Sequence, residues 1–201
     1  MKNIAIFASG NGSNFQALVN AVKQRTLQAN IALVVCDRPG AYVIERAEAE
    51  NIPIFLFHPK QYQNKAAYET IILAKLVEMN IEFIALAGYM RLIGPTILKN
   101  YEGKIVNIHP SLLPAFPGLD AIGQSLQAGV KQTGVTIHYV DEGMDTGKII
   151  AQQAVPISVD ETRESLQVKI QAVEHQLYPA TLQKLLNFSS SFSTRTQLEA
   201  K

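Results

Sequence analysis

The stretch Asn107-Ile108-His109-Pro110 holds residues whose types and spacing could do acid–base chemistry. Side chains alternate in an extended chain, so Asn107 and His109 are expected on one side of a strand and Ile108 on the other. Pro110 cannot donate to a sheet ladder and disfavours helix at His109, so the ring is expected at a strand's C-terminal end. Open parallel sheets bind ligands at that edge, which makes Asn107 and His109 candidate active-site residues. The alternative is a histidine that caps a loop and an asparagine that bonds backbone.

A glycine-rich turn near the N-terminus is a candidate anion site. The apolar run 3–8 leads into Ser9-Gly10-Asn11-Gly12-Ser13-Asn14, after which apolar residues recur at helical spacing from Phe15. Strand, turn and helix favour phosphate binding by backbone N–H groups at the helix N-terminus. Asp37 lies where a dinucleotide-binding fold has its ribose-binding acid, but Phe15 replaces the third glycine of that motif and no Walker lysine follows. A monophosphate is therefore favoured over a dinucleotide or a triphosphate, with an ordinary tight turn as the alternative.

Two further loops follow predicted strands. Met90-Arg91-Leu92-Ile93 comes after the apolar run Phe83-Ile84-Ala85-Leu86-Ala87, and its mixture of Met, Arg and apolar residues suits a flat heteroaromatic ligand. Its apolar residues could also simply be core. The acidic, glycine-bounded loop 141–147 includes Asp145, although an acid in such a loop is usually part of the turn itself.

The hydrophobic pattern predicts an α/β fold, a doubly wound and mostly parallel sheet with a Rossmann-like N-terminal half. Strands are expected at 3–8, 31–35, 54–57, 83–87, 105–109, 133–140 and 149–155, and helices from residue 14 and over 41–50, 62–79, 121–128 and 161–187. The third of these helices should bury Tyr68, Ile71, Ile72, Ala74, Leu76 and Val77, and the last should be interrupted near Pro179. Residues 1–187 are expected to form one domain, and the Ser- and Thr-rich residues 188–201 a disordered tail.

The composition excludes several classes of function. A formal net charge of +1 without a basic block argues against a nucleic-acid partner, and no apolar run is long enough to span a membrane. The single cysteine excludes an intramolecular disulfide and indicates a reducing compartment, and Cys36 itself is expected in the core. No cluster of Cys, His and Asp has the spacing of a metal site. We therefore expect a cytoplasmic protein that acts on small molecules.

These motifs occur in the order seen in one family. The loop at Ser9–Asn14, then Ala87-Gly88-Tyr89-Met90-Arg91, then Asn107-Ile108-His109-Pro110-Ser111-Leu112-Leu113-Pro114, then residues 141–147, resemble the folate-dependent formyltransferases. The resemblance covers about residues 3 to 187. The glycine-serine-asparagine loop narrows it to the members that act on glycinamide ribonucleotide.

The resemblance implies transfer of a formyl group from 10-formyltetrahydrofolate to the amine of glycinamide ribonucleotide, in de novo purine biosynthesis. It implies that Asn107, His109 and Asp145 are catalytic, with Asn107 also touching the folate. The remaining assignments by position are ribonucleotide contacts at Gly12, Ser13, Asn14 and Glu174, and folate contacts at Lys65, Met90, Arg91, Leu92 and Ile93. Lys65 stands where many members have arginine, and Asp120-Ala121-Ile122 where some have histidines. No metal is implied, and a monomer or homodimer is expected.

Three alternatives share parts of this pattern. A formyltetrahydrofolate deformylase passes the formyl group to water, and such enzymes carry an additional N-terminal domain. A methionyl-tRNA formyltransferase would bring a C-terminal domain and more positive charge. A non-catalytic nucleotide-binding module would keep only the first loop. Transfer chemistry itself suits the residues present, because an oxyanion needs fixed donors and a carboxylate near His109 would favour the charged ring.

Overall fold

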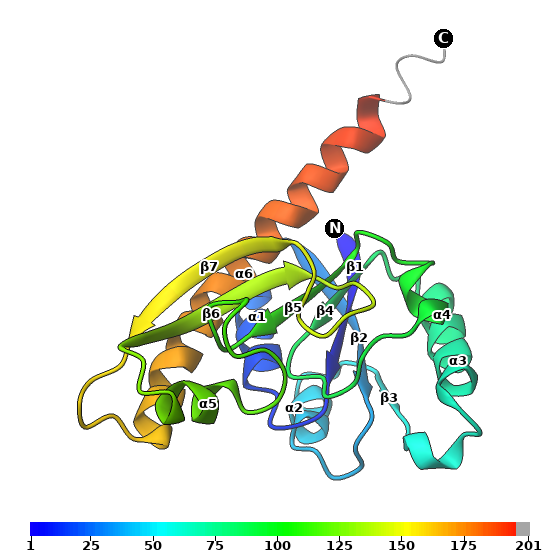
Figure 1. Cartoon of the computed structure of the whole chain (residues 1–201). Coiled ribbons are helices and arrows are strands. Elements are labelled where there is room, and N and C mark those ends of the chain that lie inside the picture. Colours follow the sequence, from blue (N-terminus) through cyan, green and yellow to red (C-terminus); the bar gives the residue numbers. More distant parts are fainter. Residues whose placement is uncertain (196–201) are drawn as a thin grey trace.

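Seven strands form one sheet with helices on both faces (Figure 1). The computed structural model describes residues 1–195, with side chains as far as residue 187. The strands are β1 (Lys2–Ala8), β2 (Ala29–Cys36), β3 (Ile54–Leu56), β4 (Phe83–Leu86), β5 (Ile105–His109), β6 (Gln132–Tyr139) and β7 (Ile149–Pro156). The helices are α1 (Ser13–Lys23), α2 (Val43–Ala49), α3 (Lys65–Glu78), α4 (Pro95–Leu98), α5 (Ala121–Gln127) and α6 (Arg163–Arg195), with a 3-10 turn at Pro59–Gln61.

The strand order is β3-β2-β1-β4-β5-β6-β7. Strands β1 to β5 are mutually parallel, whereas β6 pairs antiparallel to β5 and β7 antiparallel to β6. The predicted α/β fold with a mostly parallel sheet is confirmed. Because parallel strands end at one edge, the loops that follow β1, β2, β4 and β5 meet there.

The two faces of the sheet are covered by separate layers of side chains. Helices α1, α2 and α6 pack on the face that carries Val106 and Ile108, whereas α3 and α4 pack on the face that carries Ile105. The alternation predicted for β5 therefore holds, since consecutive residues enter opposite cores. Asn107 and His109 share the side of Ile105.

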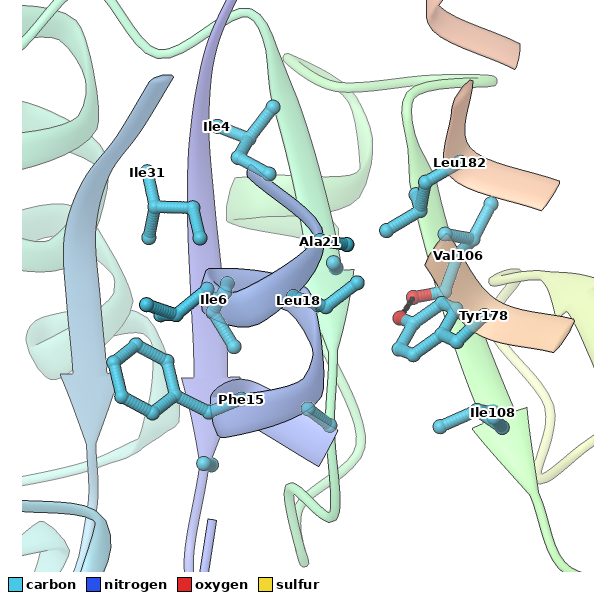
Figure 2. Close-up of a cluster of buried hydrophobic side chains, with 14 of the residues drawn as sticks. Ile4, Ile6, Phe15, Leu18, Ala21, Ile31, Val106, Ile108, Tyr178 and Leu182 are labelled. Atoms are coloured by element: carbon cyan, nitrogen blue, oxygen red, sulfur yellow. Dashed lines mark hydrogen bonds between the residues drawn. The ribbon is translucent and has the colours of Figure 1, made fainter. Parts of the chain in front are cut away.

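Tyr178 anchors helix α6 to the middle of the sheet. Its ring is fully buried beside Leu18 of α1 and Val106 of β5 (Figure 2). Its hydroxyl donates to the carbonyl of Leu86 across 2.8 Å, and the carbonyl of Val106 lies 3.4 Å away. One side chain thus holds α6 against both β4 and β5, the strands that lead into the candidate site.

Helix α3 differs from its prediction at its start and in its buried face. It begins at Lys65 rather than at residue 62, because the Asn64 side chain accepts the N–H of Ala67 across 2.9 Å and caps the helix there. Ile71, Ala74 and Val77 are exposed, so their prediction as core residues is wrong. Glu69 is buried instead, beside Tyr68, Ile72 and Leu76.

Helix α6 is not interrupted at Pro179, which corrects the prediction of a break. A proline removes one backbone hydrogen bond, but the buried side chains of Tyr178 and Leu182 on either side of Pro179 hold the helix on the sheet. In Figure 1 its C-terminal part extends away from the sheet. The backbone is helical over residues 188–195, where a disordered tail was predicted, and residues 196–201 lie outside the described residues. None of the helices within residues 1–195 is long and apolar enough to cross a membrane.

The Tyr178 hydroxyl gives a first prediction. Tyr178→Phe leaves the Leu86 carbonyl without that donor and should lower the free energy of unfolding by about 1 kcal/mol. Urea denaturation measures the change. Tyr42→Phe is the control, because the Tyr42 ring is half exposed and loss of its hydroxyl should change stability by less than about 0.5 kcal/mol. Equal effects of the two variants would contradict an anchoring role for Tyr178.

Candidate active site

The structure brings together Asn107, His109 and Asp145, which were predicted from two separate motifs. The Asn107 amide nitrogen lies 3.3 Å from Asp145 Oδ1, and His109 Nδ1 lies 3.4 Å from Asp145 Oδ2. The backbone N–H of Gly118 also donates to Oδ2, across 2.8 Å. Asp145 has φ of +57°, a conformation that costs energy for a non-glycine residue and that turns its carboxylate back over the end of β5.

His138 belongs to this cluster, although the sequence analysis did not select it as a site residue. It lies opposite Asn107 in the β5–β6 ladder, and its Nε2 is 3.2 Å from the Asn107 amide nitrogen and 3.5 Å from Asp145 Oδ1. The alternation along β6 put His138 on one face with Thr136, but the register against β5 was needed to place it beside Asn107. The antiparallel pairing of β6 supplies that register.

The carbonyl groups around the two rings assign their protons. His138 Nδ1 lies 2.8 Å from the carbonyl of Tyr139, which can only accept, so this nitrogen carries a hydrogen. Nε2 can accept from Asn107 when the ring is neutral and donate to Asp145 when the ring is protonated. His109 Nε2 lies 2.8 Å from the carbonyl of Phe116 and therefore also carries a hydrogen. The other His109 nitrogen, Nδ1, faces the carboxylate of Asp145.

Asp145 is held in its ionised form by these neighbours. Burial opposes ionisation of its carboxyl group, but the hydrogen bond from His138, the Gly118 N–H and the positive charge available on His109 and His138 outweigh that effect and lower the pKa of Asp145. The site therefore contains a buried carboxylate surrounded by donors. It can hold a ring and an amide in fixed orientations and favour positive charge on the ring.

The glycine-rich turn has the geometry of an anion site. Gly12 is the N-cap of α1, with φ of +76° and no side chain to cap the helix, so the N–H groups of the first turn are available to a ligand. A Cβ atom at Gly12 would lie 2.7 Å from Cγ2 of Val43, so only glycine fits there. Arg46 of α2 donates to both oxygens of Asn11 and fixes the turn from the other side.

Glu174 of α6 reaches this turn. Its carboxylate accepts the Asn14 amide across 3.0 Å, so two residues assigned to the ribonucleotide by resemblance are in contact. Burial raises the pKa of Glu174 to about 7, and the Asn14 hydrogen bond offsets only part of that shift. Oδ1 of Asn14 is buried without a partner within the described residues, which leaves one acceptor for a ligand.

The turn at 90–93 lies beside the first loop. Ser9 Oγ accepts the N–H of Met90 across 2.9 Å and donates to Asp37 Oδ1, and Arg91 Nε donates to Asp37 Oδ2 across 2.6 Å. Asp37 thus joins the ends of β1 and β2 to this turn, and both of its oxygens are engaged within the protein. The Arg91 side chain is paired with Asp37, Met90 and Leu92 are exposed, and Ile93 is buried.

Lys65 contacts the same turn from helix α3. Its Nζ donates to the carbonyl of Leu92 across 2.9 Å. Four residues later, Glu69 accepts the N–H of Gly94 across 2.6 Å. The sequence analysis missed Glu69, because a single acidic residue in an amphipathic helix gives no signal of burial.

A groove of about 800 Å³ lies elsewhere, between α1 and α6. It reaches the anion site at Ser13 and is lined further along by polar side chains such as Gln16 and Gln183, but not by Asn107, His109 or Asp145. Within residues 1–195, no group of three or more His, Cys, Asp or Glu side chains could hold a metal ion. The groove and the Asn107 cluster are therefore separate features of the described residues.

A glycine turn at a helix N-terminus, the turn 90–93 and a donor cluster around one carboxylate lie at the carboxyl edge of the parallel strands, where α/β enzymes bind small molecules. The comparisons give the particular family. The chain belongs to the formyl transferase family, whose sequence model matches residues 2–182.

Similar proteins cover nearly the whole chain. The phosphoribosylglycinamide formyltransferase of Bacillus subtilis (strain 168) is 57% identical over 190 residues, which are 94% of this chain and 97% of that protein. The crystal structure of glycinamide ribonucleotide transformylase 1 from Geobacillus kaustophilus has 64% identity and a TM-score of 0.90, over 92% of this chain and 99% of the other. The crystal structure of phosphoribosylglycinamide formyltransferase from Bacillus halodurans has 59% identity and a TM-score of 0.90, and the match covers 92% of this chain and 95% of the other.

The raised pKa of Glu174 predicts a pH-dependent stability. The folded protein binds the proton of the Glu174 carboxyl group more tightly than the unfolded chain does, so this proton stabilises the folded state. The stabilisation is fully present below about pH 4.5 and is lost as the pH rises through about 7. Glu174→Gln cannot titrate. From about pH 5 to about pH 8, the free energy of unfolding of the parent should fall by on the order of 3 kcal/mol relative to this variant.

Urea denaturation at several pH values measures this difference. Glu164→Gln is the matched control, because Glu164 lies on the same helix and is exposed, and its curve should follow the parent. Parallel curves for the parent and Glu174→Gln would show that Glu174 does not carry the shifted proton.

Proposed function

We propose that this chain transfers the formyl group of 10-formyltetrahydrofolate to the amine of glycinamide ribonucleotide, yielding formylglycinamide ribonucleotide and tetrahydrofolate. The observation that carries the proposal is the contact of Asn107, His109 and His138 with the single carboxylate of Asp145 at the end of β5. Membership of the formyl transferase family and the 57% identical relative support the reaction and the substrate. The protein acts on small molecules in the cytoplasm, as a monomer or homodimer.

The ribonucleotide phosphate binds at Gly12, Ser13 and Asn14. The positive φ of Gly12 and the free N–H groups of the first turn of α1 support this assignment, since a phosphate takes backbone donors at a helix N-terminus. Glu174 contacts the same substrate close to Asn14, with which it shares a hydrogen bond. Its pKa of about 7 lets the carboxyl group donate or accept near neutral pH.

The folate binds along the turn Met90, Arg91, Leu92 and Ile93, largely through backbone groups. The exposed side chains of Met90 and Leu92 offer apolar surface to a flat ring. Lys65 supports the turn through the Leu92 carbonyl. The formyl donor is a substrate of the reaction, and the proposal requires no metal.

Attack of the amine nitrogen on the formyl carbon makes a C–N bond and converts the formyl oxygen into an oxyanion. Asn107 and His109 supply its donors. Nε2 of His138 accepts one N–H of the Asn107 amide. The second N–H faces Asp145 Oδ1, 3.3 Å from the amide nitrogen, and is the one that donates to the oxyanion when the substrate is bound. The substrate competes with the Phe116 carbonyl for the N–H of His109.

Collapse of the intermediate breaks the bond between the formyl carbon and the folate nitrogen. That nitrogen must gain a proton and the attacking amine must lose one. His109 provides the proton for the leaving nitrogen, and the neutral ring that remains takes up the proton that the attacking amine loses. Asp145 stabilises the charged form of the ring. The net reaction moves one formyl group and one proton between two nitrogens, without oxidation or reduction.

Release of tetrahydrofolate, measured with and without glycinamide ribonucleotide, tests the proposal. Transfer predicts release only when the ribonucleotide is present. Equal release in its absence would make the protein a deformylase, and no release under either condition would make it a binding module.

Asn107 gives the sharpest prediction from this mechanism. Asn107→Ala should lower kcat by about a hundredfold, because the donor acts in the transition state, with smaller changes in the dissociation constants of both substrates. Steady-state kinetics and calorimetry separate the two effects. Asn30→Ala is the control, since Asn30 is exposed on β2 and should leave both unchanged. Loss of substrate affinity that matches the loss of kcat would assign Asn107 to ground-state positioning.

A further inference from the structure

Glu69 is a buried carboxyl group that the proposed mechanism does not use. It is 2% exposed and lies on the apolar face of α3, beside Ile72 and Tyr68. Burying a carboxyl group costs free energy unless its oxygens are hydrogen-bonded, yet Oε2 has no partner within the described residues. Its hydrogen bond is the one from the Gly94 N–H to Oε1. The position of Gly94, directly after the turn 90–93, indicates what this group does.

Lys65 and Glu69 lie one helical turn apart and hold the same segment. Lys65 binds the Leu92 carbonyl and Glu69 binds the Gly94 N–H, so both ends of Leu92-Ile93-Gly94 are fixed to α3 while the Ile93 side chain fills the core between them. The contact is close. A Cβ atom at Gly94 would lie 2.6 Å from Glu69 Oε2 and 2.8 Å from Lys65 Cδ.

The opposite end of the turn is held by other elements. Ser9 accepts the Met90 N–H, and Asp37 pairs with Arg91. The backbone from Met90 to Gly94 is therefore held from two sides, by the ends of β1 and β2 and by helix α3. A ligand recognised through backbone groups gains affinity when those groups are already in place, because binding then orders no loop.

We propose that Glu69 is a positioning residue for the folate, which presets the turn Met90–Ile93 by holding the Gly94 N–H, in concert with Lys65. This inference rests on the proposed function, because it takes the turn as the folate site. Glu69 itself does not touch the substrate. Burial raises the pKa of its carboxyl group, against the opposing effects of the Gly94 N–H and Lys65.

Glu69→Ala and Glu69→Gln separate positioning from general packing. Glu69→Ala leaves the Gly94 N–H without its acceptor and should raise the KM for 10-formyltetrahydrofolate about tenfold, with the ribonucleotide KM within about twofold of the parent. Glu69→Gln keeps an acceptor oxygen and should restore the parent KM. Glu78→Ala, on the exposed face of the same helix, is the control and should behave as the parent.

Two readouts independent of turnover complete the test. Hydrogen exchange at the Gly94 amide should be faster in Glu69→Ala than in Glu69→Gln. The dissociation constant of tetrahydrofolate, measured by calorimetry, should rise in Glu69→Ala together with the KM for 10-formyltetrahydrofolate and return to the parent value in Glu69→Gln. Should Glu69→Ala fail to fold, Lys65→Ala removes the exposed partner of the clamp and should raise the folate KM with the same selectivity.

The outcomes are distinguishable from those that test the proposed function. A parent protein that neither binds tetrahydrofolate nor transfers the formyl group would overturn both. An active parent whose folded Glu69→Ala variant binds tetrahydrofolate equally well would overturn the inference alone. Equal losses for both substrates, without rescue by Glu69→Gln, would reduce Glu69 to a packing residue.

Discussion

The site depends on one buried carboxylate. Asp145 is the meeting point of a backbone N–H, an asparagine amide and two imidazole rings that come from β5, β6 and the loop at Gly118. Burial alone would raise the pKa of this carboxyl group, but the donors assembled around it outweigh burial and lower the pKa. The left-handed backbone at Asp145 is a local cost that this cluster offsets.

The sheet explains how the candidate substrate-binding and catalytic residues come to lie together. Parallel strands β1, β2, β4 and β5 end at one edge, and hydrogen bonds from Ser9 and Asp37 join the loops that follow them. The antiparallel β6 then brings His138 against Asn107. Each loop is thus fixed by side chains from elements distant in sequence. This suits a reaction whose two substrates must meet with little motion of the groups that hold them.

The sequence predicted what depends on local pattern. Apolar runs indicated the strands and the parallel sheet, the alternation along β5 put Asn107 and His109 on one side, and Gly12 indicated the turn before α1. Residues whose position depends on contacts distant in sequence were missed. His138 could be placed only from the pairing of β6 with β5. Glu69 could be placed only from the contact between α3 and the turn before α4. The break expected at Pro179 was wrong because packing of Tyr178 and Leu182 overrides a local preference. Asp37 was weighed as a ribose-binding acid, but both of its oxygens bind protein groups.

The rate of the chemical step in Asp145→Asn, followed in a single turnover with both substrates bound, tests the central role of this carboxylate. The substitution keeps the size of the side chain and removes its charge, so we expect the rate to fall on the order of a hundredfold or more while both substrates still bind. Asp141→Asn is the matched control, because Asp141 lies in the same loop and accepts hydrogen bonds from Gly143 and Thr146, away from the Asn107 cluster, and it should retain the parent rate. A folded Asp145→Asn protein that transfers the formyl group at the parent rate would contradict the account.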